Sequence, residues 1–201
     1  MSILSSCLKD KPESLPDRLV WNPELAFPVG TKHYGMNAES GFDTTLFELN
    51  PATGLPLWTD RIEVVMEGSI AFDLSNLDPR IDSVNQVLFR LSVSNEFPNE
   101  TMAQAYFLDA ARIILDSMFS EGPINLPPGI PTGEGETSEA SVVRKDAIFD
   151  RERIKPLKNA TDILFRAVLL NKEIDTALVP FYPFYLIQME IGMMTDLTIE
   201  L

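Results

Sequence analysis

The clearest pattern in the chain is an alternation of apolar and polar side chains over residues 61–74. A period of two is typical of a β-strand with one buried and one solvent-exposed face. The same alternation recurs over residues 84–95 and 184–193, and more briefly over 197–201. We therefore predict four strands, and the short connection between the first two favours antiparallel pairing.

A helical period follows the second of these segments. Apolar residues recur at three- and four-residue intervals between a start signal at Asn99 and a Gly-Pro stop after residue 121. We predict one long helix at 99–121 that covers the sheet. Residues 142–173 are predicted to add helical or mixed structure, and the apolar run Ile163–Leu170 is compatible with either a helix or a buried strand.

Residues 1–58 show neither period. They hold six Pro and four Gly, yet they also carry large apolar side chains, which disordered tails usually lack. This combination predicts an extended arm at 1–58 that lies on its own core or on a neighbouring molecule. The core domain is then predicted at 59–201, with a Pro- and Gly-rich loop at 120–141 projecting from it.

Together these segments predict an α+β fold. It consists of an antiparallel β-sheet covered by one long helix, with an extended Pro-rich N-terminal arm and a long Pro/Gly loop. The large apolar residues of the arm and the loop are the candidate subunit contacts: Leu15, Trp21, Phe27, Phe42, Phe47, Trp58, Ile124, Leu126 and Ile130.

The composition is that of a globular chain with an acidic surface. The 201 residues are 45% hydrophobic and 23% charged, and the formal net charge is −14. This charge repels phosphate, so we expect no sequence-specific binding of nucleic acid. No apolar run of about 18 residues occurs, so we expect no transmembrane helix and no membrane partner. The N-terminus lacks the features of a signal peptide, and we expect synthesis in the cytoplasm.

A basic segment between Arg144 and Lys158 interrupts the acidic surface. Its first interpretation is a solvated helix face on which opposite charges pair at a spacing of four residues. The alternative is a contact for an acidic patch on a neighbouring subunit.

Residues suited to nucleophilic catalysis or phosphate binding are scarce. His33 is the single histidine and Cys7 the single cysteine, and the two lie far apart in sequence. One cysteine also excludes an internal disulfide. No Walker or dinucleotide-binding glycine motif occurs. The aromatic residues at 181–185 lack basic neighbours, so the core or an interface is the favoured place for them, rather than a stacking platform.

Carboxylates are abundant but poorly spaced for catalysis or for metal binding. Glu63 and Glu67 lie about 13 Å apart along a strand, which is too far for a paired acid and base. Asp73, Asp78 and Asp82 do not match a calcium loop and are explained as turn residues. We therefore expect no catalytic residue, no cofactor and no metal.

These features favour a structural assembly subunit of a larger homo- or hetero-oligomeric particle, without catalytic activity. Arms and loops bury area on neighbouring copies in rings, tubes and shells, and a phage capsid, neck, tail or baseplate fits this pattern. Copies of the chain and other structural proteins are the expected partners, and a virion the expected destination. The alternatives are a monomeric ligand- or protein-binding module and a carboxylate-based hydrolase.

Overall fold

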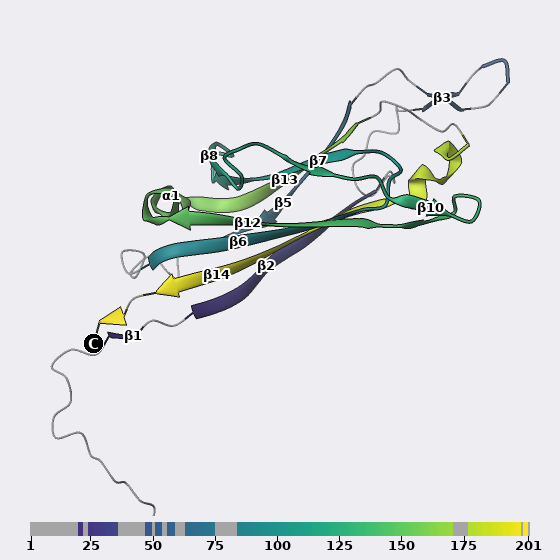
Figure 1. The fold of residues 1–201 in the computed structure, drawn as a ribbon. Coiled ribbons are helices and arrows are strands. Elements are labelled where there is room, and N and C mark those ends of the chain that lie inside the picture. Colours follow the sequence, from purple (N-terminus) through teal and green to yellow (C-terminus); the bar gives the residue numbers. More distant parts are fainter. Residues whose placement is uncertain are drawn as a thin grey trace, which may run out of the picture.

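The computed structural model describes residues 20–21, 24–35, 47–49, 51–53, 56–58, 63–74, 84–170, 177–197 and 199–200. Most of the strands belong to two antiparallel sheets that face each other as a β-sandwich (Figure 1). The first sheet holds, in order, β12 (Ser141–Asp150), β6 (Val84–Asn95), β14 (Leu186–Leu197) and β2 (Glu24–Gly35). The second holds β5 (Glu63–Ala71), β13 (Ala160–Leu170), β7 (Thr101–Asp109) and β8 (Ile114–Ser117), and β9 (Ile124–Leu126) also pairs with β7.

Smaller elements surround the two sheets. Three two-strand ribbons join β1 (Val20–Trp21) to β15 (Ile199–Glu200), β3 (Phe47–Leu49) to β4 (Pro56–Trp58), and β10 (Ile130–Thr132) to β11 (Thr137–Glu139). The α-helix of the described residues is α1 (Arg151–Leu157), which begins at an Asp150 cap. A 3₁₀ helix, η4 (Val179–Phe184), precedes β14.

Four phenylalanine rings form the centre of the core between the sheets. Phe89 and Phe149 come from β6 and β12 of the four-stranded sheet. Phe107 comes from β7 of the other sheet, and Phe72 directly follows β5. The ring of Phe89 lies 5.0 Å from those of Phe107 and Phe149 and 6.1 Å from that of Phe72. Tilted and edge-on ring pairs at such distances are favourable, so this cluster ties the two sheets together.

A buried polar side chain holds the chain where β6 leaves its sheet. The amide of Asn95 donates hydrogen bonds to the carbonyl oxygens of Asn99 at 2.9 Å and Pro127 at 3.0 Å. Its own carbonyl oxygen accepts a hydrogen bond from the backbone N–H of Phe97 at 3.0 Å. Buried backbone groups need partners, and Asn95 supplies them where strand pairing stops.

The predicted helix at 99–121 is wrong, because these residues form β7 and β8 and the turn between them. The Asp109 carboxylate accepts hydrogen bonds from the backbone N–H groups of Ala111 and Ile113, and Arg112 adopts a φ of 62°. An Asp that bonds the backbone just after it favours a turn over a helix. The turn lets β7 pair with β13 on one side and with β8 and β9 on the other, and this pairing overrides the local helix propensity.

The predicted fold class is therefore wrong as well. A second β-sheet, rather than a long helix, covers the first sheet, and α1 is only seven residues long. Residues 142–173 contain most of β12, then α1 and β13, and the ambiguous run Ile163–Leu170 is a strand. The long loop predicted at 120–141 carries the short strands β9, β10 and β11.

Part of the segment interpreted as an arm belongs to the first sheet. Residues 24–35 form β2, which pairs with β14 along its whole length (Figure 1). The register slips between Ile191 and Gly192, where Val29 becomes the extra residue of a β-bulge next to Pro28. Proline and bulges are tolerated at a sheet edge, and together they erase the period of two that would have revealed this strand.

Candidate interaction surface

One face of the four-stranded sheet points away from the second sheet, and we call it the outer face. Side chains alternate across a strand, so the even-numbered residues of β12 and β14, and those of β6 from Gln86 onward, lie on this face. The strand register aligns them in rows that cross the sheet, in which neighbouring side chains contact one another.

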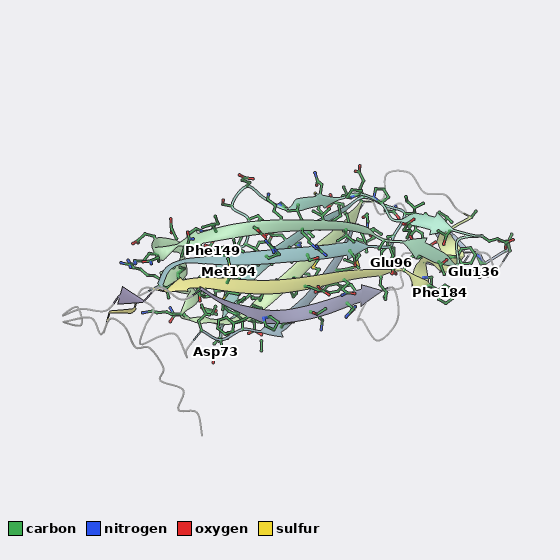
Figure 2. All side chains as sticks on the ribbon, turned by 60° about the horizontal axis from the view of Figure 1, so that its bottom comes forward. Asp73, Glu96, Glu136, Phe149, Phe184 and Met194 are labelled. Carbon is green, nitrogen blue, oxygen red and sulfur yellow. The ribbon has the colours of Figure 1, made fainter. Side chains whose placement is uncertain are left out.

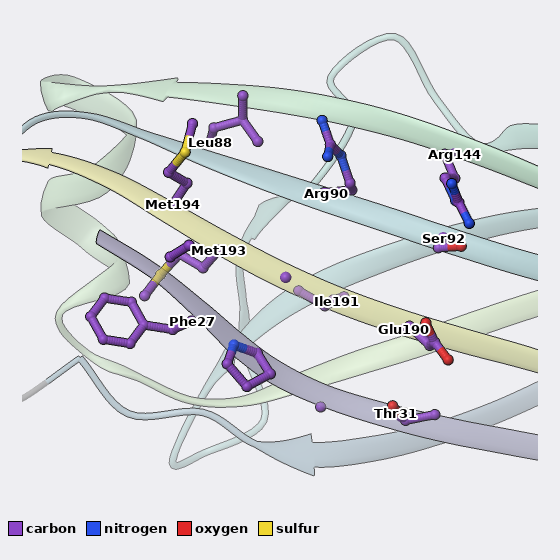
Figure 3. A pocket seen from close by; sticks show the side chains of 14 residues that line it. Phe27, Thr31, Leu88, Arg90, Ser92, Arg144, Glu190, Ile191, Met193 and Met194 are labelled. Atoms are coloured by element: carbon purple, nitrogen blue, oxygen red, sulfur yellow. The ribbon is translucent and has the colours of Figure 1, made fainter. Parts of the chain in front are cut away.

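One of these rows is apolar, and we call it the apolar row. Ile148 of β12 pairs with Leu88 of β6, Leu88 pairs with Met194 of β14, and Met194 pairs with Ala26 of β2. Ile148 is 60% exposed and Met194 is 37% exposed. Figure 2 places Met194 toward one end of the sandwich, and the close view places Leu88 beside it (Figure 3). Phe27, which is 42% exposed, lies at the same end (Figure 3).

The outer face is hollowed next to the apolar row. A hollow of about 610 Å³ is lined by residues of β2, β6, β14 and β12 (Figure 3). Gly192 and Ser92 lie on the floor of this region, and neither has a long side chain to fill it. The bulge at Val29 shifts β2 just where it passes Gly192. The hollow therefore follows from small residues on two central strands and a bulge on the edge strand.

Charged residues occupy the other end of the hollow. The Nε and Nη2 atoms of Arg90 donate hydrogen bonds to Oδ1 and Oδ2 of Asp146, each at 2.7 Å. These hydrogen bonds, helped by the charge of Arg90, hold the pKa of Asp146 below its usual value, although partial burial opposes the shift. Arg144 is exposed and makes no ion pair with another described residue, and Glu190 lies across from it in the close view (Figure 3).

The candidate contact residues whose side chains are described fall in different places. Ile124 and Leu126 of β9 are buried in the core, where they are 5% and 1% exposed. Ile130 of β10 is 65% exposed. Phe27 lines the hollow. Phe27 pairs with Met193, an odd-numbered residue of β14, so its side chain is on the opposite parity from the apolar row. The structure thus brings one of these candidates to the border of the hollow.

The remaining candidates belong to the N-terminal part of the chain. Trp21 is in β1, opposite Ile199, and Phe47 of β3 is in register with Trp58 of β4. Leu15 and Phe42 lie outside the described residues.

Sequence reasoning missed the residues of the apolar row, although a signal for them was present. Leu88 is an apolar residue on the parity of β6 that otherwise carries Arg90 and Ser92. Ile148 has a similar position on β12, but that strand was expected to be helical. Apolar side chains on the solvent-exposed parity of two paired strands form the kind of patch that points to a contact surface.

The sequence candidates for chemistry are not gathered into a site. His33 is exposed on β2, opposite Gln188 of β14. Oε1 of Glu67 forms an ion pair with Nε of Arg166 at 3.2 Å. Cys7, Asp78 and Asp82 lie outside the described residues. Among the residues that the structure describes, no group of three or more His, Cys, Asp or Glu side chains is placed to hold a metal ion.

Most of the aromatic segment at 181–185 belongs to the core. Tyr182 donates a hydrogen bond to Oδ1 of Asn99, and Tyr185 donates one to the carbonyl oxygen of Gly135, both at 2.6 Å. Burial raises the pKa of the Tyr185 phenol. Phe184 is the exception, with 66% of its surface exposed.

The basic segment does not form one helix face. Arg144 lies on β12 and Arg153 lies in α1. The guanidinium of Arg153 binds Asp116 at 3.0 Å and packs 3.7 Å from the centre of the Phe149 ring. Arg153 therefore links α1 to β8 of the second sheet. In the part of the chain with described coordinates, no helix is long and apolar enough to span a bilayer.

Comparison with known proteins gives remote similarities in structure. No protein-family model matches the chain, and no curated protein matches it either. Among solved structures, a protein from Parabacteroides distasonis matches 66% of the chain with 15% identity and a TM-score of 0.46. The enzymatically active domain of tailspike protein 4 of bacteriophage CBA120 matches 90% with 10% identity and a TM-score of 0.36. A chain of infectious bursal disease virus, Gx strain, matches 90% with 8% identity and a TM-score of 0.35.

The chain spans 38%, 19% and 32%, respectively, of the lengths of these three chains. Structural neighbours thus include proteins of a phage tail and of a virus. The proposal that follows rests on the surface of this chain itself.

Proposed function

We propose that the chain is a structural assembly subunit of a larger homo- or hetero-oligomeric particle, such as a phage capsid, neck, tail or baseplate. Its partners are copies of itself and other structural proteins, and it joins the particle after synthesis in the cytoplasm. The proposal assigns it no catalytic activity.

The apolar row carries this proposal. Ile148, Leu88 and Met194 are adjacent on three neighbouring strands, and two of them are substantially exposed. Single exposed apolar residues are ordinary, but a continuous row across a sheet marks a contact surface. Burying such a row against a neighbour stabilises association by about 25 cal/mol for each Å² of apolar surface removed from water.

The occupant we assign to the row is a second copy of this chain. The acidic net charge of −14 opposes association at long range, so an apolar contact with paired charges at its border is the kind that holds copies together. Arg90 and Asp146 form such a neutralised border beside the row.

The test is the native mass by light scattering over a wide range of protein concentration. We expect masses well above 22.5 kDa for the wild-type chain and a shift toward the monomer in the Met194→Lys variant. Ile114→Lys is the matched control, because Ile114 is 55% exposed but lies on the second sheet. A wild-type chain that stays monomeric throughout, or equal effects of the two variants, would overturn the proposal.

A second candidate, a ligand-binding module, is favoured by the polar end of the hollow. Thr31, Ser92, Arg144 and Glu190 line that end, and apolar residues such as Leu88 and Met194 line the rest of the hollow. Ligand sites combine apolar lining with a few polar groups in this way. Chemical-shift changes at these four residues on addition of small carboxylates or sugars, in a chain that is monomeric, would support the module over the assembly subunit.

A further inference from the structure

β12 is an edge strand with an unusually regular free side. It is the terminal strand of the four-stranded sheet, and β6 is its strand partner in the described part of the chain. All ten of its residues pair with β6 without a bulge. It contains no Pro and no Gly. Proteins usually protect edges by shortening, bulging or interrupting them, or by pointing a charged side chain inward. Lys145 is the inward charge of β12, and Glu121 of the same chain pairs with it, so the strand keeps its capacity to pair with another chain.

The outward side chains of β12 follow a symmetric pattern. Val142 and Ile148 are 57% and 60% exposed, and they flank two exposed charged residues, Arg144 and Asp146. The order is apolar, positive, negative, apolar, and Lys145 lies at its centre. Reversing the strand direction exchanges Val142 with Ile148 and Arg144 with Asp146.

We propose that β12 pairs antiparallel with β12 of a second copy, around a two-fold axis that passes between the two Lys145 residues. This inference rests on the proposed assembly function and specifies one contact within it. In this register Val142 faces Ile148 of the other copy, and Arg144 faces Asp146. Two four-stranded sheets then join into one continuous sheet, with both outer faces on the same side.

The charges select this register over its neighbours. Side chains directly opposite each other across antiparallel strands must lie on the same face, so the register can shift only in steps that keep this parity. A shift by one such step in one direction places Arg144 opposite Arg144 of the other copy. A shift in the other direction places Asp146 opposite Asp146 of the other copy. Like charges directly opposite are destabilising, whereas opposite charges contribute favourably.

Arg144 and Asp146 are available for this pairing. Arg144 makes no ion pair with another described residue of its own chain. Each oxygen of Asp146 accepts one hydrogen bond from Arg90. A carboxylate has about four acceptor positions, so Asp146 retains capacity for a second guanidinium. The pairing would place Asp146 between Arg90 of its own chain and Arg144 of the other copy.

The inward side of the strand accommodates the contact as well. Val143 faces Ala147 of the other copy, which is an apolar pair. The two Lys145 residues face each other, but each ammonium lies against the segment between β8 and β9 of its own chain. Its Nζ atom lies 3.5 Å from Oε2 of Glu121 and 4.9 Å from the centre of the Phe119 ring. A counter-ion and an aromatic face thus offset the repulsion at the axis.

Site-specific crosslinking of the full chain tests the register directly. In a Cys7→Ser background, a mixture of the Val142→Cys and Ile148→Cys variants should form a disulfide-linked dimer under mild oxidation. Opposite Cβ atoms in antiparallel strands lie about 4.5–5.5 Å apart, close enough for a disulfide after small shifts. Each variant alone is the matched control, because its cysteine then faces a wild-type side chain and should yield little crosslink.

A charge exchange provides a second readout without cysteines. Arg144→Asp should weaken the dimer about tenfold or more, since it places two acidic residues opposite each other at two symmetric positions. Adding Asp146→Arg in the same chain restores opposite charges across the axis and should recover most of the affinity. The single variant Asp146→Arg also loses the ion pair with Arg90 of its own chain. It shows how much of the change in dimer affinity comes from the loss of that internal pair.

The outcomes separate this inference from the proposed function. A crosslink specific to the mixture, together with rescue by the double exchange, supports the β12 contact. Particles or oligomers without the specific crosslink overturn the β12 contact and leave the assembly function standing. A chain that remains monomeric and uncrosslinked at every concentration overturns both.

Discussion

Replacement of Phe89 tests the account of the core most directly. Its ring is fully buried and contacts the rings of Phe72, Phe107 and Phe149, so it touches both sheets. Burial of a Phe side chain contributes about 1.5–3 kcal/mol, and each ring pair adds roughly 0.5–1.5 kcal/mol. Removing the ring also leaves a cavity that the surrounding strands can only partly close.

We therefore expect Phe89→Ala to lower the free energy of unfolding by about 3–5 kcal/mol. Phe89→Leu keeps most of the volume but loses the ring pairs, and should cost less than the alanine variant. Phe184→Ala is the matched control, since Phe184 is 66% exposed, and its effect should stay within about 0.5 kcal/mol.

The assay is urea denaturation followed by far-ultraviolet circular dichroism, at a concentration where light scattering shows one species. That condition matters because association would add to the apparent stability of every variant. Effects of Phe89→Ala and Phe184→Ala that agree within about 0.5 kcal/mol would refute the assignment of Phe89 to the centre of the core.

Three further predictions concern individual residues. Asn95→Ala should lower the free energy of unfolding in urea by about 2 kcal/mol or more, because it removes three hydrogen bonds to the backbone groups of Phe97, Asn99 and Pro127; a smaller loss would contradict that role. Gly135→Ala should lower the melting temperature more than Gly133→Ala. Both glycines have a positive φ, but a Cβ atom on Gly135 would come within 2.8 Å of two side chains and one on Gly133 would meet nothing, so equal effects would count against this packing. The pKa of the Asp146 carboxyl, measured by nuclear magnetic resonance, should lie below the usual value for Asp because of its hydrogen bonds to Arg90, and it should rise in Arg90→Gln. Since the pKa of Asp146 is lower in the folded state, the contribution of its charge to stability is complete above the pKa of the unfolded state and is lost as the pH falls through the pKa of the folded state. A titration midpoint that does not respond to Arg90→Gln would exclude Arg90 as the cause.

The strands that sequence reasoning found are those with one solvent-exposed face and one buried face. The predicted strand at 84–95 is β6, and the alternation over 61–74 contains β5. The strand predicted at 184–193 overlaps β14, which begins at Leu186 and ends at Leu197. In these segments each residue contacts either the core or water, so burial imposes the period of two on the sequence.

β7 carries no such period because both of its faces are largely covered. Ala103, Gln104 and Ala105 are consecutive and all buried. Gln104 is buried because its amide binds the backbone of Phe119 at 2.8 Å, an interaction between segments that sequence periodicity does not reveal. Because β7 has no fully solvent-exposed face, the spacing of apolar residues in this segment resembles that of a helix.

The candidate surface was recoverable only in part. Phe27 is among the candidate subunit contacts predicted from the sequence, and it lines the hollow. Leu88 and Ile148 are far apart in sequence and become neighbours only through the pairing of β6 with β12. A surface that spans several strands depends on strand order, which is set by contacts between distant segments.

The sequence by itself determined where several strands run, which of their side chains face the core, and that the surface is acidic, because these properties depend on local order and composition. It also contains the symmetric order of residues 142–148. Only the tertiary structure decided that a second sheet, and not a helix, covers the first, and that β12 lies at an edge with β2 at the opposite one. The physical reason is that backbone hydrogen bonds of a sheet join segments distant in the chain, so the same alternating strand can be central or at an edge without any change in its own sequence.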